Sequence, residues 1–316
     1  MEKPSTLVFL ITGFLDSGKS TFIRDLLIGQ EFTEGEKTLL ILTEEGEEEF
    51  DEKELAGVNV DLVTVDSKEE FTSEFLNNCK GYYRPKYVFI EYNGMWKMDD
   101  ILDMDMPEGW MLNQIVTMVD GTTFESYLAN MKPLLFDIFA VSEMIFFNRC
   151  TPDMQLAMYR RSIRAVNRRV QIGFEDMEGN PIDIGKEELP YDINADVIEI
   201  ADEDFGVFYV DILDEPEKYV DKMVSFKGKA YLSKEFPEGY FVPGRHAMTC
   251  CADDIQFIGF ACKTKYIDKF KTNMWLQITA MVKYEYFPSY HGKGPVLYLK
   301  RAVSAQKPEE ELVYFG

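Results

Sequence analysis

Residues 7–22 read LVFLITGFLDSGKSTF, and this stretch decides the fold of the first half of the chain. Its apolar run at residues 7–11 is typical of a buried strand, and an apolar-periodic helix follows it. Between the two, residues 13–20 match G-x-x-x-x-G-K-[ST], the pattern of a phosphate-binding loop. A strand before the motif and a helix after it favour this interpretation over a glycine-rich turn with a chance lysine. The stretch therefore predicts a protein that binds a nucleotide.

Each residue type in this motif suits phosphate chemistry. Gly13 and Gly18 let the backbone curl so that its N–H groups face phosphate oxygens, which the positive end of the following helix also attracts. We expect Lys19 to reach the β- and γ-phosphates and the hydroxyl of Ser20 to bind Mg²⁺. The remaining predicted nucleotide contacts in the loop are Asp16, Ser17 and Thr21.

Composition limits the compartment and the partners. The chain has 316 residues, enough for one or two domains, and its formal net charge is -23. This acidity argues against a nucleic-acid partner or an anionic membrane surface. No apolar run is long enough to cross a bilayer, the first strand starts too early for a signal peptide, and the five cysteines do not form a disulfide framework. We therefore expect a cytoplasmic protein without a transmembrane segment.

Strands alternate with helices through the first half of the chain. Strands are predicted at residues 37–42, 58–65, 87–91, 115–120 and 143–147, and helices at residues 69–78 and 153–165. This alternation predicts an α/β fold: a doubly wound, mainly parallel sheet with helices on both faces, of the P-loop type. In such a sheet the nucleotide binds at the carboxyl ends of the strands.

The strand at residues 87–91 ends in a carboxylate, Glu91. A strand-end acid beside a phosphate loop is where such enzymes hold Mg²⁺ or position the attacking water. We therefore predict Lys19 and Glu91 as catalytic residues, with Ser20 and Glu91 as ligands of the magnesium ion. The alternative is a surface glutamate that only closes a strand.

The second half of the chain has a different pattern. Residues 1–172 are predicted as the P-loop domain, residues 173–204 as an acidic connector and residues 205–316 as a second domain. Short alternating runs predict a small all-β barrel of the OB type, at residues 224–231, 240–242, 255–260, 275–282 and 296–299. OB barrels often bind oligonucleotides. The acidic composition of the whole chain nevertheless favours a protein without a nucleic-acid partner.

Residues 244–254 read GRHAMTCCADD, the sharpest local feature of the second half. The vicinal thiols of Cys250 and Cys251, with His246 four residues earlier, could hold a thiophilic ion such as Zn²⁺. Adjacent side chains on a strand point to opposite faces, so both thiols reach one ion only if the chain turns there. A buried core cysteine beside an incidental thiol is the alternative.

The order of motifs in the first half resembles the CobW-type P-loop GTPases, relatives of the nickel-insertion GTPases of urease and hydrogenase. The loop GFLDSGKST is similar to that family's GFLGAGKTT, and residues 91–94 match its E-T-S-G at Glu91 and Gly94. Asp120 ends a similar valine-rich strand. The guanine-reading N-K-x-D motif falls at residues 148–151. The resemblance covers about residues 5–170 and implies GTP as the nucleotide, with Asn148 and Arg149 among its contacts.

Three departures from that family affect what the resemblance implies. Asp16 replaces a loop glycine and places an acid near the phosphates, which opposes binding unless it faces away or helps hold the metal. Thr151 replaces the aspartate that reads guanine, so ATP is not excluded, although Asp153 could substitute for it in a re-shaped loop. The family's C-x-C-C metal motif is missing, since only Cys79 lies in that region.

The MTCCAD stretch resembles the C-terminal soluble domain of YcgQ-type accessory subunits of membrane permeases. This second resemblance covers roughly residues 205–306. The two together imply a GTPase of the metal-chaperone type that couples nucleotide hydrolysis to metal homeostasis, a metalloprotein client or a membrane permease. A degenerate nucleotide-binding protein that does not hydrolyse, and whose barrel docks a partner or a metal, is the alternative. An ATP-dependent transferase would need an acceptor site, for which the sequence shows no motif.

Overall fold

The computed structural model describes residues 5–29, 32–44, 50–185, 189–248 and 255–315. The chain forms two compact units, which are described separately. The first comprises residues 1–156 and 169–183, and the second comprises residues 157–168 and 184–316. By its contacts, helix α7 (Leu156–Val166) thus lies almost wholly in the second unit although strands of the first unit flank it in sequence. The predicted domain boundaries, after residue 172 and before residue 205, stay a prediction.

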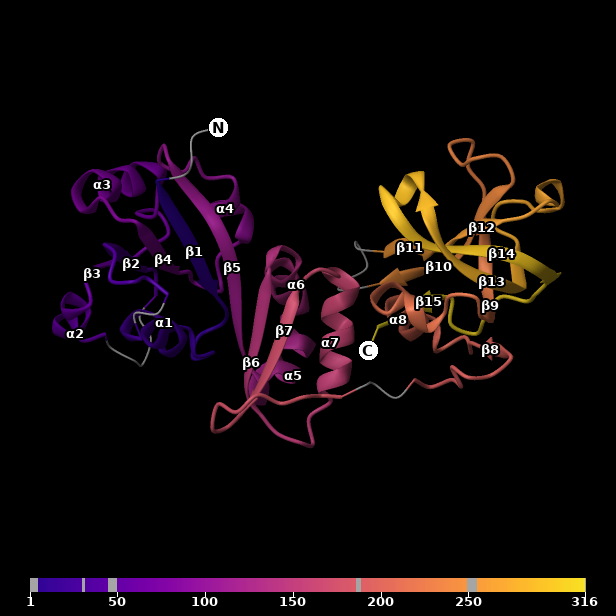
Figure 1. The fold of residues 1–316 in the computed structure, drawn as a ribbon, viewed down its shortest axis with the longest axis horizontal. Coiled ribbons are helices and arrows are strands. Elements are labelled where there is room, and N and C mark those ends of the chain that lie inside the picture. The colour runs from indigo at the N-terminus through magenta and orange to yellow at the C-terminus, as the bar shows by residue number, and fades with distance from the viewer. Residues whose placement is uncertain (1–4, 30–31, 45–49, 186–188, 249–254, 316) are drawn as a thin grey trace. The chain divides into compact units, whose positions relative to one another are not determined.

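The first unit is built on a sheet of parallel strands, and the predicted P-loop fold is confirmed (Figure 1). The strand order is β3-β2-β4-β1-β5-β6-β7. The strands are β1 (Thr6–Thr12), β2 (Thr38–Leu42), β3 (Val60–Thr64), β4 (Tyr87–Glu91), β5 (Trp110–Asp120), β6 (Met144–Cys150) and β7 (Gln171–Asp176). Strand β1 is central and almost fully buried, as expected for a strand covered on both faces.

Helices cover both faces of this sheet. They are α1 (Lys19–Ile28), α2 (Glu52–Gly57), α3 (Ser73–Tyr83), α4 (Met98–Leu102), α5 (Gly121–Asn130) and α6 (Lys132–Val141). Since crossovers between parallel strands are right-handed, α1 and α2 lie on one face and α3 to α6 on the other. The contacts of α1 with α2 and of α4 with α6 agree with this division.

The predicted helix at residues 69–78 is wrong in its bounds. Helix α3 begins at Ser73 because the hydroxyl of Thr72 accepts the N–H of Phe75 at 3.2 Å and so caps the first turn. The helix then continues to Tyr83. Strand β7 completes the sheet beside β6. Residues 173–176 of this strand were predicted as part of the connector.

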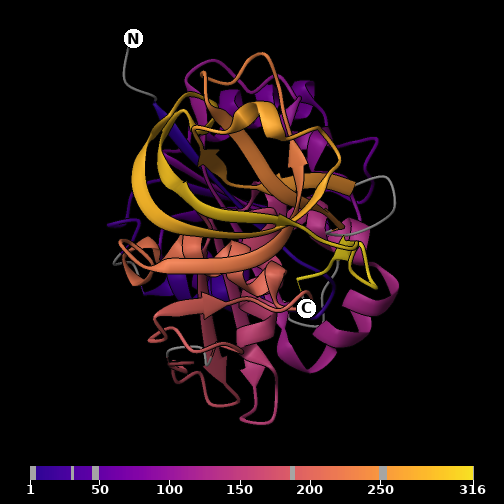
Figure 2. The same ribbon diagram turned by 90° about the vertical axis from the view of Figure 1, so that its right-hand side faces the viewer.

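The second unit contains a closed five-stranded barrel, which confirms the predicted β-barrel. The ring runs β9-β10-β12-β14-β13 and closes because β9 pairs with both β10 and β13. Its long strands β13 and β14 pair side by side and curve around the barrel (Figure 2). The strands of this unit are β8 (Val197–Glu199), β9 (Met223–Tyr231), β10 (Tyr240–Met248), β11 (Ile255–Gly259), β12 (Ala261–Lys263), β13 (Trp275–Phe287), β14 (Gly292–Ser304) and β15 (Leu312–Val313).

Helix α8 (Phe205–Asp214) packs on this barrel, although the sequence pattern did not predict it. Its residues Phe205 and Phe208 enter the barrel core, where their rings lie 5.4 Å from those of Phe226 and Phe260 respectively. Short 3₁₀ turns lie at Pro216–Lys218, Ile267–Lys269 and Pro288–Tyr290. No described helix is both long enough and apolar enough to span a bilayer.

One buried cation fastens three segments of the second unit together. Arg245 of β10 is only 2 % exposed, and burial lowers its pKa below the usual range. Its guanidinium donates to the backbone carbonyls of Asp202 and Glu310 at 2.5 Å each and lies 5.9 Å from the ring of Phe205. These bonds hold the segment before α8 and the C-terminal segment against the barrel.

Candidate functional site

The phosphate loop joins β1 to α1 and owes its shape to two glycines. Gly13 has a φ of 136° and Gly18 a φ of 90°, conformations that residues with a side chain rarely adopt. A Cβ atom on Gly13 would lie 2.2 Å from the carbonyl oxygen of Met118, and one on Gly18 would lie 2.6 Å from the amide nitrogen of Asn148. Helix α1 begins at the next residue, so the N–H groups of its first turn face the loop.

Lys19 lies inside the loop rather than in solvent. Its side chain is 3 % exposed, and its Nζ donates to the carbonyls of Gly13 and Phe14 at 2.9 Å each. It also forms an ion pair with Glu44, which follows β2. The sequence reasoning did not single out Glu44, and its position just after the second buried strand is the signal that could have found it. The ammonium group is therefore already where phosphate oxygens would approach the loop.

The structure brings Ser20 and Glu91 into direct contact. The Ser20 hydroxyl donates to Oε1 of Glu91 at 2.9 Å, and Glu91 is 2 % exposed at the end of β4. The surface-glutamate alternative therefore does not hold. Gly94, just beyond, lets β4 and the loop approach, since a Cβ there would lie 2.2 Å from the carbonyl oxygen of Gly13. Thr21, the next residue in α1, is half-buried.

The end of β6 is bonded to the phosphate loop. The side-chain amide of Asn148 donates to the carbonyl of Ser17 at 2.8 Å. The guanidinium of Arg149 donates to the carbonyl of Asp16 at 2.9 Å and to the carboxylate of Asp120 at 2.6 Å. Asn148 and Arg149, the two residues predicted to contact the nucleotide, thus lie at the phosphate loop. Their hydrogen bonds support the loop backbone from the side of β6.

The carboxylate of Asp153 lies beside Thr151, two residues further along the chain. The hydroxyl of Thr151 donates to Oδ1 of Asp153 at 2.6 Å. This hydrogen bond lowers the pKa of Asp153, so the carboxyl group is ionised at neutral pH. Thr151 therefore holds an exposed acceptor in the loop that follows β6.

Asp16 adopts a left-handed backbone with a φ of 60°, and its side chain is exposed. Aspartate is among the residues that tolerate this conformation, whereas most others are strained there. Its carbonyl, not its carboxylate, makes the contact with Arg149. The carboxylate therefore adds a negative charge beside the loop.

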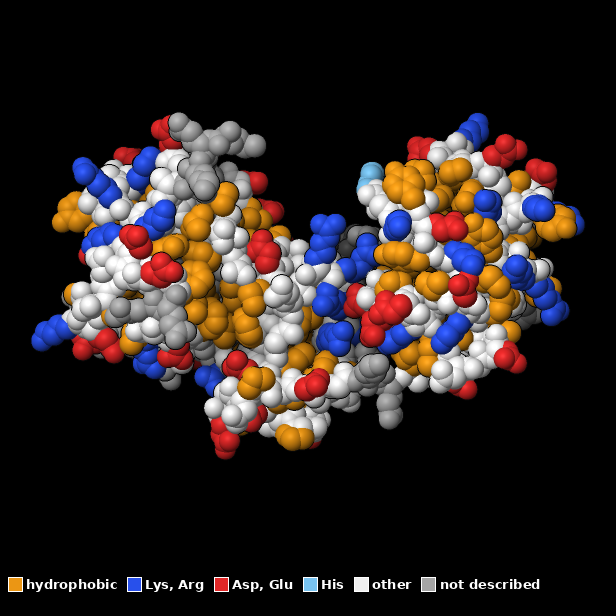
Figure 3. Space-filling view, viewed as in Figure 1, with side chains coloured by type: hydrophobic (Ala, Val, Ile, Leu, Met, Phe, Trp, Pro, Cys, Tyr) orange, Lys and Arg blue, Asp and Glu red, His pale blue; other side chains and the backbone are white. Residues whose placement is uncertain are grey.

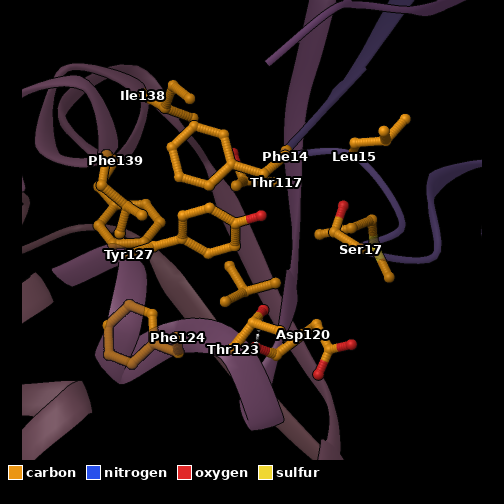
Figure 4. Close-up of a pocket in the computed structure, with 14 residues that line it drawn as sticks. Phe14, Leu15, Ser17, Thr117, Asp120, Thr123, Phe124, Tyr127, Ile138 and Phe139 are labelled. Carbon is orange, nitrogen blue, oxygen red and sulfur yellow. Dashed lines mark hydrogen bonds between the residues drawn. The ribbon is translucent and has the colours of Figure 1, made fainter. Parts of the chain in front are cut away.

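A small, mainly apolar pocket adjoins the loop (Figure 4). It lies among Phe14 and Leu15 of the loop, the end of β5, and helices α5 and α6. The ring of Phe14 lies 4.4 Å from that of Tyr127, so the pocket walls pack against the loop. Its apolar lining does not suit phosphate groups.

The groups of the loop suit the binding of a nucleoside triphosphate with Mg²⁺. The hydroxyl of Ser17 is buried and has no hydrogen-bond partner among the described residues, so a ligand atom could satisfy it. Ser20 and Glu91 offer adjacent oxygen atoms, which are the ligands that Mg²⁺ prefers. The donors and the charge at this site therefore fit both groups.

The predicted transition-metal site is not assembled in the described part of the chain. Cys250 and Cys251 lie outside the described residues. His246 lies on β10 with its ring 5.3 Å from that of Phe257. No group of three His, Cys, Asp or Glu side chains within the described ranges could hold a metal ion. The buried thiols of Cys79 and Cys150 have pKa values raised to about 11, because burial disfavours the thiolate.

Comparisons with known proteins agree with this organisation. Residues 7–173 match the family model of the CobW/HypB/UreG nucleotide-binding domain, and residues 183–315 match that of the DUF1980 C-terminal domain. No curated protein matches the chain.

Solved structures with some likeness include a GTPase and hydrogenase maturation factors. The HypB protein of Archaeoglobus fulgidus is 18% identical, over 55% of this chain and 83% of its own, with a TM-score of 0.41. The Zn(II)-bound YjiA GTPase of E. coli is 17% identical, over 74% of each chain, with a TM-score of 0.44. The nickel complex of HypB from Helicobacter pylori is 10% identical, over 55% of this chain and 80% of its own, with a TM-score of 0.37.

Replacing Asp16 tests the charge in the loop. Asp16→Gly should tighten the binding of a nucleoside triphosphate with Mg²⁺ roughly threefold to tenfold, because it removes a like charge near the phosphates. Calorimetric titration measures the affinity. Asp16→Asn removes the charge but tolerates the same backbone, so an equal gain identifies the charge as the cause. Weaker binding in both variants would mean that the carboxylate helps to hold the metal.

Proposed function

The chain belongs to the CobW/HypB/UreG family, and we propose that it is a Mg²⁺-dependent GTP hydrolase. The observation that carries this proposal is the 2.9 Å contact between Ser20 and Glu91, beside the buried ammonium of Lys19. A phosphate loop with a cation in place and a buried strand-end carboxylate has the parts that phosphoryl transfer to water requires.

Each of these residues has a defined task in the proposed reaction. Lys19 exchanges the carbonyls of Gly13 and Phe14 for β- and γ-phosphate oxygens and stabilises the charge that develops on them. Ser20 and Glu91 would hold the magnesium ion, which neutralises phosphate charge when bound. The Glu91 carboxylate could instead orient the attacking water, and both tasks need a buried acid at this strand end. Because such catalysis is mostly positioning, turnover is expected to stay slow until a partner completes the site.

Base selectivity is proposed to rest on Asp153 rather than on Thr151. Guanine offers an N1–H and an exocyclic amine, which an ionised carboxylate accepts well. A threonine hydroxyl accepts more weakly, and here it already donates to Asp153. We assign Asn148 and Arg149 the supporting role, since their side chains bond to the loop carbonyls of Ser17 and Asp16.

The second unit is proposed to link the nucleotide cycle to a metal ion or to a partner protein. The support is family membership of the first unit together with the vicinal thiols of residues 250 and 251. A metalloprotein client and a membrane permease are the two partners that fit this proposal. Its proposed location is the cytoplasm.

The first prediction from the proposed function concerns Lys19. Wild-type protein should bind GTP with Mg²⁺ in a calorimetric titration, and Lys19→Ala should weaken binding about tenfold or more, because the phosphate charge loses its buried partner. Lys53→Ala, an exposed lysine of α2, is the matched control. Equal binding of ATP and GTP would agree with a nucleoside triphosphatase but would contradict the proposed preference for GTP. No binding of either would leave a non-hydrolysing protein whose barrel carries the function.

The second prediction concerns Asp153. Asp153→Asn should weaken GTP binding roughly tenfold and leave ATP binding unchanged, because the acceptor for guanine is lost. The same variant should gain affinity for xanthosine triphosphate, because the C2 carbonyl of xanthine accepts a hydrogen bond from the new side-chain amide. Asp137→Asn, on the exposed face of α6, is the control. Unchanged GTP affinity in Asp153→Asn would contradict the assignment, and a gain in Thr151→Asp would then place base reading at residue 151.

The third prediction concerns the thiols. Zn²⁺ should bind with one equivalent in competition with a chromogenic chelator, and the double variant Cys250→Ser/Cys251→Ser should lose this binding. His246→Gln should weaken it, and affinity should fall as pH decreases because the ligand thiols must lose their protons. The raised pKa values of Cys79 and Cys150 make those thiols poor competitors. Undiminished Zn²⁺ binding in the double variant would exclude this site.

A further inference from the structure

The charge of the chain is unevenly distributed. The whole chain carries -23, but residues 223–307, which form the barrel strands, contain 13 Lys and Arg against 6 Asp and Glu. The strand region of the barrel is therefore basic although the protein is acidic. On the side of the barrel seen in Figure 3, Lys and Arg side chains lie among hydrophobic and acidic ones. The acidity of the whole chain therefore does not exclude a polyanionic partner for this part of the molecule.

Aromatic and basic side chains gather on one outer face of this barrel. We call this the aromatic–basic face and define it by Lys229, Tyr231, His246, Phe257 and Trp275. The pairing registers place them together, because Lys229 lies opposite both residue 244 of β10 and Trp275 of β13, and His246 lies opposite Phe257 of β11. Lys229 and Tyr231 are two residues apart on β9 and so share a side of the sheet. Their inward neighbours on β9, β10 and β13 are buried.

The rings of this face form a row of contacts. The centroid of Phe257 lies 5.3 Å from that of His246 and 5.6 Å from that of Tyr231. The Nζ of Lys229 lies 5.9 Å from the ring centroid of Trp275. Tyr231 is 45 % exposed, which leaves its ring accessible to a flat ligand.

Three acids, Glu309 to Glu311, precede β15, which pairs with β10 at His246. Glu311 forms an ion pair with Lys307 at 2.9 Å, and its pKa is lowered by Lys307 first and then by Lys229 and His246. Lys229 makes no ion pair with another residue of the described chain. Its charge is therefore available to an anion from outside the chain.

We propose that the aromatic–basic face binds single-stranded nucleic acid, with bases stacked on Tyr231 and Phe257 and the phosphate backbone along Lys229. Aromatic rings beside lysines are the usual combination for binding single strands without sequence preference. The face lies mainly on β9, β10 and β13 of the ring, with Phe257 on the adjoining strand β11. The proposal does not depend on nucleotide hydrolysis in the first unit.

Two other polyanions compete for the same charges. An anionic membrane would also attract lysines and interfacial aromatic rings, and an acidic surface of a second copy would pair with them. Neither requires an accessible ring such as that of Tyr231, because neither offers flat bases to stack. A duplex has its bases already stacked and should bind more weakly than a single strand.

The test uses full-length protein and a fluorescent oligothymidylate without a terminal phosphate, which keeps the phosphate loop out of the measurement. Fluorescence anisotropy should show binding that weakens roughly tenfold or more between about 50 mM and about 200 mM salt. Tyr231→Ala and Phe257→Ala should each weaken it about tenfold, and Lys229→Ala should weaken it and flatten the salt dependence. Tyr231→Leu keeps the apolar bulk and separates loss of stacking from loss of fold.

Exposed residues outside the aromatic–basic face provide matched control variants. Tyr286→Ala and Lys265→Ala, both exposed and outside the face, should leave binding unchanged, with thermal unfolding checked for every variant. Binding unaffected by Tyr231→Ala and Phe257→Ala would overturn the proposal, as would tighter binding of a duplex. Binding to phosphatidylserine vesicles, or salt-sensitive self-association, without oligonucleotide binding would assign the face to a membrane or to a second copy.

Discussion

The nucleotide site depends on close approaches between backbone segments that tolerate no side chain. Gly13 meets the carbonyl of Met118 on β5, Gly18 meets Asn148 at the end of β6, and Gly94 meets Gly13 from beyond β4. Each contact joins the phosphate loop to a different strand, so the loop is shaped by the sheet as much as by its own sequence. The same strands deliver Glu91 and Asn148, and the positions of the charged and polar groups therefore follow from the packing of glycines.

The charges at the site are arranged around one buried cation. Lys19 is held by two carbonyls of its own loop and by Glu44, while Glu91 is held by Ser20. Paired in this way, a buried lysine and a buried glutamate avoid the cost of isolated charges in a low-dielectric interior. Phosphate oxygens are stronger acceptors than these carbonyls. Lys19 can therefore exchange the carbonyls for a phosphate group when a nucleotide binds.

Local patterns in the sequence predicted the parts of the fold that depend on neighbours in the chain. The strand before the loop, the loop itself and the strand ending at Glu91 were all visible as short motifs. Glu44 and the bond from Asn148 to Ser17 were not, because they join segments that only the folded sheet brings together. Helix α8 was missed because its almost entirely apolar sequence, FGVFYVDILD, shows no helical period. The basic barrel was hidden by a whole-chain charge that averages over two unlike units.

Helix α7 gives the chain an interlaced construction. Its residues pack with the barrel unit, yet strands β6 and β7 on either side of it complete the sheet of the other unit. The polypeptide therefore passes from one unit to the other three times, near residues 156, 168 and 183. A proteolytic cut near residue 183 leaves all residues of the first unit in one fragment but separates α7 from the rest of the second unit. A gene fragment that ends before the barrel likewise deprives α7 of its packing partners.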